Sequence, residues 1–338
     1  MAGTRGHRIR PARSSPAHAV ETRQCRQFGS RVHSLTERVC VIANPAAGRG
    51  RGARLLPAVR SAFAARGITD IRATDKHTGE TALAASAIAD GATTIVCLGG
   101  DGTCGNVANA ILHSNASIRF GVIPGGTGND FAKTLGVTST SIEEIARLAS
   151  EPSDHRIDVG RVDDRFFLNC CGFGFDVAVL QSLAQSRWLR GNGVYVYTAL
   201  RQLLGFRGLN IAIRSLVADH EQSLYMMLVI ANAPYFGGTF IIAPAAVATD
   251  GELDAVLVLD ASSLRRLRLL GAASRGAHTS YREVRVNRAA EFELAFDEPQ
   301  FYETDGEVHQ ARRATVDVRC VPGALRVISP ATSPRALP

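Results

Sequence analysis

The chain has 338 residues, more than one small domain needs, and its 46% hydrophobic and 20% charged residues are typical of a globular protein. Its net charge of +7 does not indicate a nucleic-acid partner, because six of those charges lie in residues 1–38, where eight Arg face two Glu. No segment has the roughly 20 uninterrupted apolar residues of a membrane-spanning helix. The best candidate, residues 224–247, is interrupted by Asn, Gly and Pro.

The two ends of the chain differ from the rest. Residues 1–37 are Arg-rich and lack the apolar core of a secretory signal, so we interpret them as a disordered basic leader, with a mitochondrial transit peptide as the alternative. Residues 331–338 form a short tail. The seven Cys are odd in number and include no CxxC pair, which favours reduced thiols. We therefore expect a cytoplasmic protein with no more than peripheral membrane contact.

Residues 38–152 alternate short β-branched runs with longer Ala- and Leu-rich stretches. Strands are predicted at 39–43, 68–74, 93–98 and 119–123, and helices at 53–66, 78–90, 103–113 and 142–150. Ser141 and Glu144 form a plausible capping box for the last of these helices. This rhythm predicts a nucleotide-binding α/β domain whose mostly parallel sheet has helices on both faces.

Residues 153–330 change to strand-sized pieces separated by Gly, Pro and Asp-Gly. Strands are predicted at 166–171, 210–217, 223–231, 253–259, 291–296 and 315–320, with a helical stretch from 176 to about 204. We expect a largely antiparallel sandwich or barrel that forms a lipid-substrate domain, whose last segment returns to the first domain.

Three glycine-rich loops each follow a predicted strand and precede a predicted helix. They lie at residues 44–50, 99–103 and 124–130. In a parallel sheet such loops share the carboxyl edge, where open α/β sheets bind ligands. Glycine lets backbone amides approach a bound oxygen, and helix N-termini attract phosphate. Any one of these loops alone is more simply a tight turn, but the three together predict a nucleotide site.

Asp101, within the second loop, has several possible roles. It would hold Mg²⁺, order the loop, or accept a proton from an attacking hydroxyl.

Several motifs resemble the diacylglycerol kinase catalytic domain family, which bacterial lipid kinases share with sphingosine and ceramide kinases. The resemblance runs from about residue 39 to 330. GGDGT alone is weak evidence, because phosphofructokinases and NAD kinases also carry it. The motifs are Asn44-Pro45-x-x-Gly48, GGDGT at 99–103, PGGTGNDFA at 124–132, Gly172-x-Gly174-x-Asp176, Tyr235-Phe236-Gly237-Gly238 and Asp305-Gly306-Glu307.

The resemblance implies a fold, a cofactor set and site residues. The fold would be a Rossmann-like α/β domain, as in NAD kinases and diacylglycerol kinases, followed by a mostly antiparallel β-sandwich domain. ATP and Mg²⁺ would be used, with the adenosine in the interdomain cleft. Val247, Asp250 and Glu252 would form a metal site. The implied ATP-binding residues are Asn44, Pro45, Ala46, Ala47, Gly48, Thr74, Gly99, Gly100, Asp101, Gly102, Thr103, Gly126, Thr127 and Asp130.

The resemblance also implies that Glu307 accepts the proton of the lipid hydroxyl. Asp101 is the rival base, and the sequence does not decide between them. The stretch 304–307 equally reads as a hairpin turn, because Asp-Gly between strand-like runs favours that geometry. After GGDGT many relatives have x-Asn-Glu, whereas this chain has Cys104-Gly105-Asn106. The carboxylate of the relatives is missing here, so a nucleotide or metal contact through that position does not carry over from the resemblance.

The expected reaction is transfer of the γ-phosphate of ATP to a lipid hydroxyl, with diacylglycerol as the leading acceptor and phosphatidic acid as product. Another lipid such as sphingosine or ceramide, a soluble acceptor as in NAD kinases, or a catalytically silent lipid-binding module are the alternatives. Residues 176–207 and 264–275 mix apolar side chains with Arg, as an interfacial helix does, although an ordinary core face explains either segment equally well. A homodimer is left open.

Overall fold

The computed structural model describes residues 38–185, 203, 205–215 and 219–330, which lie within one compact unit. The predicted leader (1–37), the tail (331–338) and the second half of the helical stretch after 185, including Arg187, Trp188 and Arg190, lie outside the described residues.

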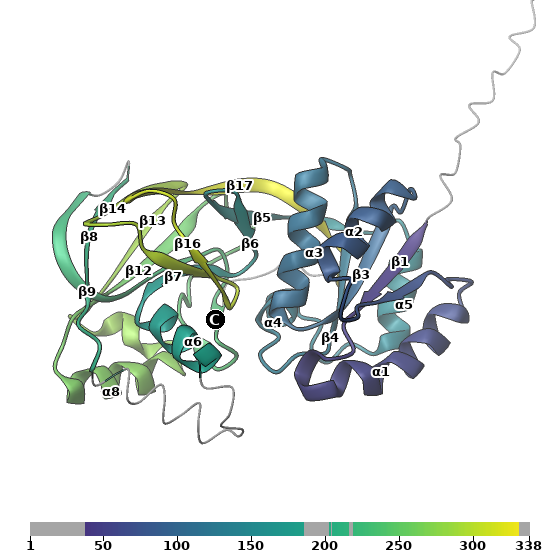
Figure 1. Ribbon diagram of the computed structural model, residues 1–338, viewed down its shortest axis with the longest axis horizontal. Helices are drawn as coiled ribbons and strands as arrows, with labels where there is room; N and C mark the ends of the chain where they lie inside the picture. The colour runs from purple at the N-terminus through teal and green to yellow at the C-terminus, as the bar shows by residue number, and fades with distance from the viewer. Residues whose placement is uncertain (1–37, 186–202, 204, 216–218, 331–338) are drawn as a thin grey trace, which may run out of the picture. The chain divides into compact units, whose positions relative to one another are not determined.

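The first part of the described chain is a parallel sheet with helices on both faces (Figure 1). Its strands pair in parallel in the order β2–β1–β3–β4. The strands are β1 (Val39–Ala43), β2 (Ile71–Ala73), β3 (Thr94–Gly99) and β4 (Arg119–Pro124). The helices are α1 (Ala47–Ala64), α2 (Glu80–Ala89), α3 (Asp101–Ser114), α4 (Asp130–Thr134) and α5 (Ile142–Ser150).

Alternate residues of β1 explain why helices cover both faces of the sheet. Val41 packs in a buried cluster with Phe63 of α1 and Ile145 of α5. Ile42 packs on the opposite face, in a cluster that contains Val107 of α3. Because both faces are buried, these strands are nearly continuous apolar runs, which is why the sequence located β1 correctly.

The described residues of the second part form mainly antiparallel strands, together with helices. Its strands are β5 (His155–Val162), β6 (Arg165–Phe167), β7 (Cys170–Gly174), β8 (Leu209–Arg214), β9 (Asp219–Ala231), β10 (Tyr235–Phe236), β11 (Phe240–Ile241), β12 (Leu253–Leu259), β13 (Val284–Ala289), β14 (Glu291–Phe296), β15 (Phe301–Thr304), β16 (Glu307–Gln310) and β17 (Thr315–Val327). Its helices are α6 (Phe175–Gln185), α8 (Ser263–Ala273) and the short 3₁₀ helix η1 (Ala277–Ser280).

The last strand joins the two parts into one sheet. β17 pairs antiparallel with β14 and β5, and its end then pairs in parallel with β4 through Arg326–Arg119 and Val327–Phe120. Strand order runs β16–β15–β7–β9–β8–β14–β17–β4–β3–β1–β2, so the β-rich part extends the parallel sheet at β4.

The predicted fold class is confirmed: a parallel-strand α/β part is followed by a β-rich antiparallel part. Strands 39–43, 253–259 and 291–296 and helix 142–150 have the predicted bounds, and Ser141 caps that helix by accepting from the Glu144 amide at 3.1 Å. The predicted strand 166–171 is divided between β6 and β7. The sequence missed β5, whose apolar run is interrupted by Asp158 and Gly160, and the five-residue helix α4.

The described cysteines are buried free thiols, as expected: Cys40, Cys97, Cys104, Cys170, Cys171 and Cys320. The sulfurs of Cys97 and Cys104 lie 3.7 Å apart, too far for a disulfide bond.

Candidate active site

The three glycine-rich loops come together at the carboxyl edge of the parallel sheet. A Cβ on Gly48 would lie 2.2 Å from the carbonyl oxygen of Gly125, and a Cβ on Gly126 would lie 2.4 Å from the Cα of Gly100. Gly48 also has φ 55°, in the left-handed region that favours glycine. Loops far apart in the sequence therefore contact one another through backbone, and side chains other than hydrogen do not fit at these positions.

Asn44 holds the first two loops together. Its Nδ2 donates to Oε1 of Glu80 at 2.9 Å and to Oγ1 of Thr103 at 3.1 Å, and its Oδ1 accepts from the Ala46 amide at 2.9 Å. Thr74 lies at the same edge, where its amide donates to the Ala43 carbonyl at 2.8 Å. The sequence did not single out Glu80, because a lone Glu in the first turn of a helix carries no pattern of its own.

The predicted ATP-binding residues thus share one edge. Pro45, Ala46 and Ala47 form the turn after β1, Gly99 to Thr103 connect β3 to α3, and Gly126 and Thr127 follow β4. Thr127 is exposed, whereas Thr103 is buried and already bonded to Asn44.

Asp130 ties the third loop to the β-rich part. Its Oδ2 accepts from the Gly238 amide at 2.7 Å, and its Oδ1 accepts from Nζ of Lys133 at 2.8 Å. Lys133 also donates to the Gly238 carbonyl at 2.8 Å. Both carboxylate oxygens of Asp130 are therefore bonded within the protein, between α4 and the loop that joins β10 to β11.

Asp101, the first residue of α3, faces a cavity. One of its oxygens, Oδ1, accepts from the Phe131 amide at 3.0 Å. Burial, reinforced by the nearby charge of Asp130, raises the pKa of Asp101 above its ordinary value.

Glu307 comes from the other part of the chain and reaches the same loop. Its Oε1 accepts from Nδ2 of Asn106 at 3.0 Å, and its Oε2 accepts from Nη2 of Arg165 at 3.0 Å. A Cβ on Gly102 would lie 3.2 Å from Oε1, so the carboxylate lies against the GGDGT loop. Sequence reasoning flagged Asn106 as a departure from the pattern and missed Arg165, which lies 142 residues from its partner.

A two-residue turn places Glu307. Asp305 and Gly306 have φ 48° and 91°, and β15 pairs with β16 on either side, as the Asp-Gly pair predicts. The Asp305 carboxylate accepts from the amides of Leu168, Asn169 and Cys170 at 2.7, 2.8 and 3.2 Å. These three bonds anchor the turn to the segment before β7.

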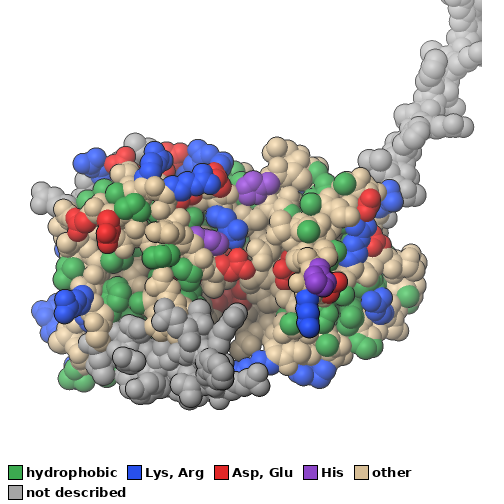
Figure 2. Space-filling view, viewed as in Figure 1, with side chains coloured by type: hydrophobic (Ala, Val, Ile, Leu, Met, Phe, Trp, Pro, Cys, Tyr) green, Lys and Arg blue, Asp and Glu red, His purple; other side chains and the backbone are tan. Residues whose placement is uncertain are grey.

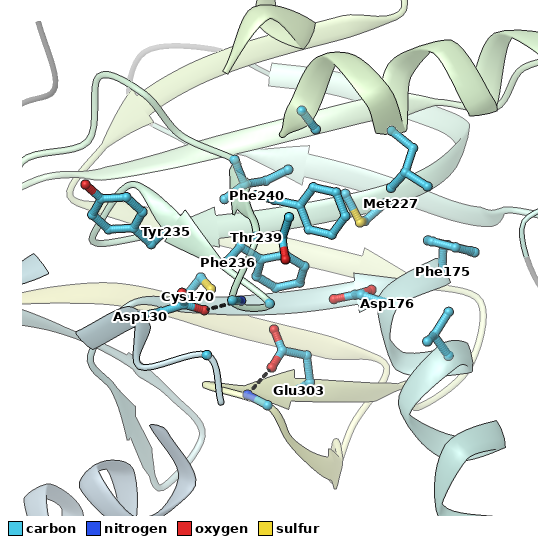
Figure 3. Close-up of a pocket in the computed structure, with 18 of the residues that line it drawn as sticks. Asp130, Cys170, Phe175, Asp176, Met227, Tyr235, Phe236, Thr239, Phe240 and Glu303 are labelled. Atoms are coloured by element: carbon cyan, nitrogen blue, oxygen red, sulfur yellow. Dashed lines mark hydrogen bonds between the residues drawn. The ribbon is translucent and has the colours of Figure 1, made fainter. Parts of the chain in front are cut away.

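The cavity beside Asp101 has a volume of about 830 Å³. Its polar lining includes Asp101, Thr127 and Asp305, and its apolar lining includes Leu269. Phe236 and Met227, also part of the apolar lining, are labelled in Figure 3. The space-filling view shows acidic side chains gathered around a hollow near the middle of the described unit (Figure 2). The arrangement can receive a molecule with one polar end and an apolar body.

The predicted metal residues have other partners. Oδ1 of Asp250 accepts from the Glu252 amide at 3.0 Å, and the Val247 carbonyl accepts from the Thr249 amide at 2.7 Å. The guanidinium of Arg288 lies 3.7 Å from the Asp250 carboxylate and 3.8 Å from that of Glu252. Within the described ranges, no group of three or more His, Cys, Asp or Glu is arranged to hold a metal ion. Arg288 already supplies the positive charge at this turn, so the side chains here do not fit a metal well.

Comparison with known proteins gives matches along both parts. Residues 38–162 match the model of the diacylglycerol kinase catalytic domain, and residues 169–329 match that of the YegS C-terminal NAD kinase beta sandwich-like domain.

Individual proteins match over most of the chain. A diacylglycerol kinase of Mycobacterium tuberculosis is 29% identical over 87% of this chain and 95% of its own length. A protein named "Probable lipid kinase YegS-like" from Pseudomonas aeruginosa is 31% identical over 73% of this chain and 80% of its own length. The crystal structure of a diacylglycerol kinase from Bacillus anthracis has the same fold, with a TM-score of 0.65 and 21% identity over 87% of this chain and 97% of that one.

Proposed function

Because the chain belongs to the diacylglycerol kinase catalytic domain family of lipid kinases, we propose that it transfers the γ-phosphate of ATP to the hydroxyl of a membrane lipid. The observation that carries this proposal is the contact of three glycine loops at one sheet edge, beside a cavity with an acidic end and an apolar body. The leading acceptor is an acylglycerol, and the names of several relatives suggest diacylglycerol.

The loop edge supports binding of the phosphates of ATP. The first-turn amides of α3 have no partner inside the helix, and the helix dipole makes that end partly positive. Thr127 adds an exposed hydroxyl beside them. We expect Mg²⁺ to be held mainly through the phosphates of ATP. When bound, Mg²⁺ neutralises charge on the β- and γ-phosphates.

Asp101 is the base that the geometry favours. It lines the cavity and its pKa is raised, whereas both oxygens of Glu307 are occupied by Asn106 and Arg165. In the proposed step the lipid oxygen bonds to the γ-phosphorus, the bond to the β–γ bridging oxygen breaks, and ADP leaves. The hydroxyl proton passes to Asp101.

Helix α8 supports a membrane-docking role next to the cavity. Leu264 and Leu267 are 61% and 40% exposed, and Arg265 and Arg268 are exposed beside them. Leu267 also lines the cavity, so the apolar interior reaches this exposed face. Arg266 does not belong to the face, because it is buried and donates to the carbonyls of residues 203 and 206 at 2.6 and 2.9 Å. None of the described helices is long and apolar enough to cross a membrane.

A transfer assay tests the function. The full chain is incubated with radiolabelled ATP and Mg²⁺ in mixed micelles that contain diacylglycerol, sphingosine or ceramide, and in separate reactions with NAD. We expect label in the diacylglycerol product. Label in NAD alone would indicate a soluble-acceptor kinase, and binding of ATP without label in any acceptor would indicate a silent module.

A further inference from the structure

Two acidic side chains that the proposed transfer step does not use also line the cavity. Asp176 lies in the first turn of α6, and Glu303 lies in β15 (Figure 3). Asp176 is 7% exposed and Glu303 is 1% exposed. Both are cavity-lining residues, so they are buried in the protein yet face the space that an acceptor would fill.

Their carboxyl groups lack hydrogen-bond partners. The Asp176 oxygens have only weak contacts with the amides of residues 176 and 177, short of a hydrogen bond, and of Glu303 only Oε2 has a partner, accepting from the Gly306 amide at 2.6 Å. Among the described residues neither side chain takes part in an ion pair. A buried acceptor without a donor is unfavourable, so three such oxygens at one cavity indicate that a bound molecule supplies donors.

Gly172 keeps the two carboxyl groups close together. It pairs with Glu303 across β7 and β15. A Cβ on Gly172 would lie 1.7 Å from Oδ2 of Asp176 and 2.9 Å from Oε1 of Glu303. The space above this glycine is therefore filled by the two carboxyl groups themselves.

The protonation of the pair limits what it can bind. Burial raises the pKa of Asp176 to about 7, and burial together with the charge of Asp176 raises that of Glu303 well above its ordinary value. Two carboxyl groups in one desolvated site do not both ionise, so at least one of them is protonated near neutral pH. Such a pair donates one hydrogen bond and accepts others, which complements a hydroxyl. An ammonium group would donate to the accepting oxygens but has no lone pair to accept the hydrogen bond that the protonated carboxyl group donates.

We propose that Asp176 and Glu303 bind a second, unphosphorylated hydroxyl of the acceptor, so that the preferred substrate is an acylglycerol with two free hydroxyls, a monoacylglycerol. The inference rests on the proposed lipid-kinase function and narrows its acceptor. In diacylglycerol the remaining glycerol oxygens are ester oxygens, which accept hydrogen bonds and donate none. Diacylglycerol supplies no donor to these carboxyl oxygens and is therefore the poorer substrate.

The test compares monooctanoylglycerol with dioctanoylglycerol in the transfer assay. For the wild-type chain we expect kcat/KM to favour monooctanoylglycerol by at least ~10-fold, because a site built to bind a hydroxyl rejects a ligand that lacks it. In Asp176→Asn and Glu303→Gln, the KM for monooctanoylglycerol should rise about 10-fold, while the KM values for dioctanoylglycerol and ATP stay within about twofold. Glu293→Gln is the control, because it removes an exposed carboxylate of β14 that pairs with Arg214.

Three outcomes would overturn the inference: equal use of both lipids by the wild type, a preference that both variants retain, or better use of sphingosine than of monooctanoylglycerol. If no lipid is phosphorylated, the proposed function fails, and calorimetric binding of the same two lipids then decides the inference. Saturable binding of monooctanoylglycerol that weakens in both variants would support it, and binding that does not differ would overturn it. Thermal unfolding of each variant checks that it is folded, and the wild-type comparison does not depend on the variants.

Discussion

Asp101 and Glu307 both lie at the loop of residues 99–103, but their carboxyl groups have different partners. Asp101 accepts from the Phe131 amide, interacts with the amides of Asn129 and Asp130, and faces the cavity, and Glu307 is held by Asn106 and Arg165. Both oxygens of Glu307 are already bonded to side chains, whereas Asp101 lines the cavity, so the two residues are suited to different roles. We expect Asp101 to take the proton and Glu307 to act as a positioning residue.

Substitution separates these roles. Asp101→Asn should lower kcat for lipid phosphorylation by about 10²–10⁴-fold with little change in the Kd of ATP, because it removes the base and retains the shape. In the wild type, kcat should fall as the pH drops through the raised pKa of Asp101. Glu307→Gln should cost less than Asp101→Asn and keep that pH dependence. A larger loss in Glu307→Gln, with the pH dependence abolished, would assign the base to Glu307.

The Asp176–Glu303 pair also predicts how stability depends on pH. Each folded-state pKa is raised, so the folded chain binds more protons than the unfolded chain between the ordinary carboxyl range and about pH 7. This contribution is full at low pH and is lost as the pH rises through the folded-state pKa. The negative charges of Asp130 and Asp305 also raise the pKa of Glu303, so they add to this effect.

We therefore expect Asp176→Asn to flatten the fall in Tm between pH 4.5 and 7.5, measured by calorimetry in the absence of lipid. At the upper end of this range the variant should be at least as stable as the wild type, because it removes a buried charge. A variant whose Tm follows the wild-type pH profile would show that Asp176 does not titrate in this window.

At the scale of elements, the turn between β15 and β16 carries Glu307 to the GGDGT loop. Asp305 stabilises this turn in two ways. Its backbone has a left-handed φ, which Asp tolerates, and its carboxylate accepts hydrogen bonds from three backbone amides. The turn and the segment before β7 therefore form one hydrogen-bonded unit.

Asp305→Ala should lower the free energy of unfolding by about 3 kcal/mol, because it leaves buried amides unpaired at a strained φ. Denaturant unfolding measures this loss. Asp305→Asn is the matched control, because Asn tolerates the same φ and still offers a carbonyl oxygen, and its loss should be smaller. Equal losses in the two variants would mean that the charge, not the hydrogen bonds, stabilises the turn.

The acidic turn after Val247 is a second element, and the role of Arg288 in neutralising its carboxylates can be tested. Because Arg288 lies beside Asp250, Glu252 and Asp254, neither EDTA nor added Mg²⁺ should change the Tm of the wild-type chain. In Arg288→Gln the carboxylates lose their counter-charge, and added Mg²⁺ should then raise the Tm. A wild-type Tm that falls in EDTA would support the metal site that the family resemblance implies.

The sequence predicted those parts of the site that depend on neighbouring residues and missed those that depend on contacts between residues far apart in the chain. The loops at residues 44–50, 99–103 and 124–130 were located because glycine between a buried strand and a helix is a local signal. The contacts of Glu307 with Arg165 and Asn106 span 142 and 201 residues and leave no local signal. Glu303 was missed for the same reason, because its environment is created by Gly172 on a strand far away in the sequence.

At the scale of the whole molecule, β17 joins the parallel sheet to the β-rich part. It lies between β14 of the β-rich part and β4 of the parallel sheet, so both parts share one hydrogen-bonded sheet. Helix α8 extends this arrangement outward, since Leu267 and Leu269 line the cavity while Leu264 and Arg268 are exposed. Leu267 and Asp101 line the same cavity, which makes α8 the candidate entry side for a lipid.

Removing the apolar, basic face of α8 tests whether the molecule draws its acceptor from a membrane. The double variant Leu264→Glu with Arg268→Glu replaces an exposed apolar side chain by a charged one and reverses a basic charge. In a sedimentation assay its binding to vesicles that contain anionic lipid should fall by roughly tenfold or more. Since these two side chains do not line the cavity, turnover of monomeric dioctanoylglycerol should persist, whereas turnover of long-chain lipid in vesicles should fall. Leu224→Glu is the control, because Leu224 is 44% exposed on β9 and lies outside the cavity lining. Equal vesicle binding by the α8 variant and the control would place the membrane-facing surface elsewhere on the chain.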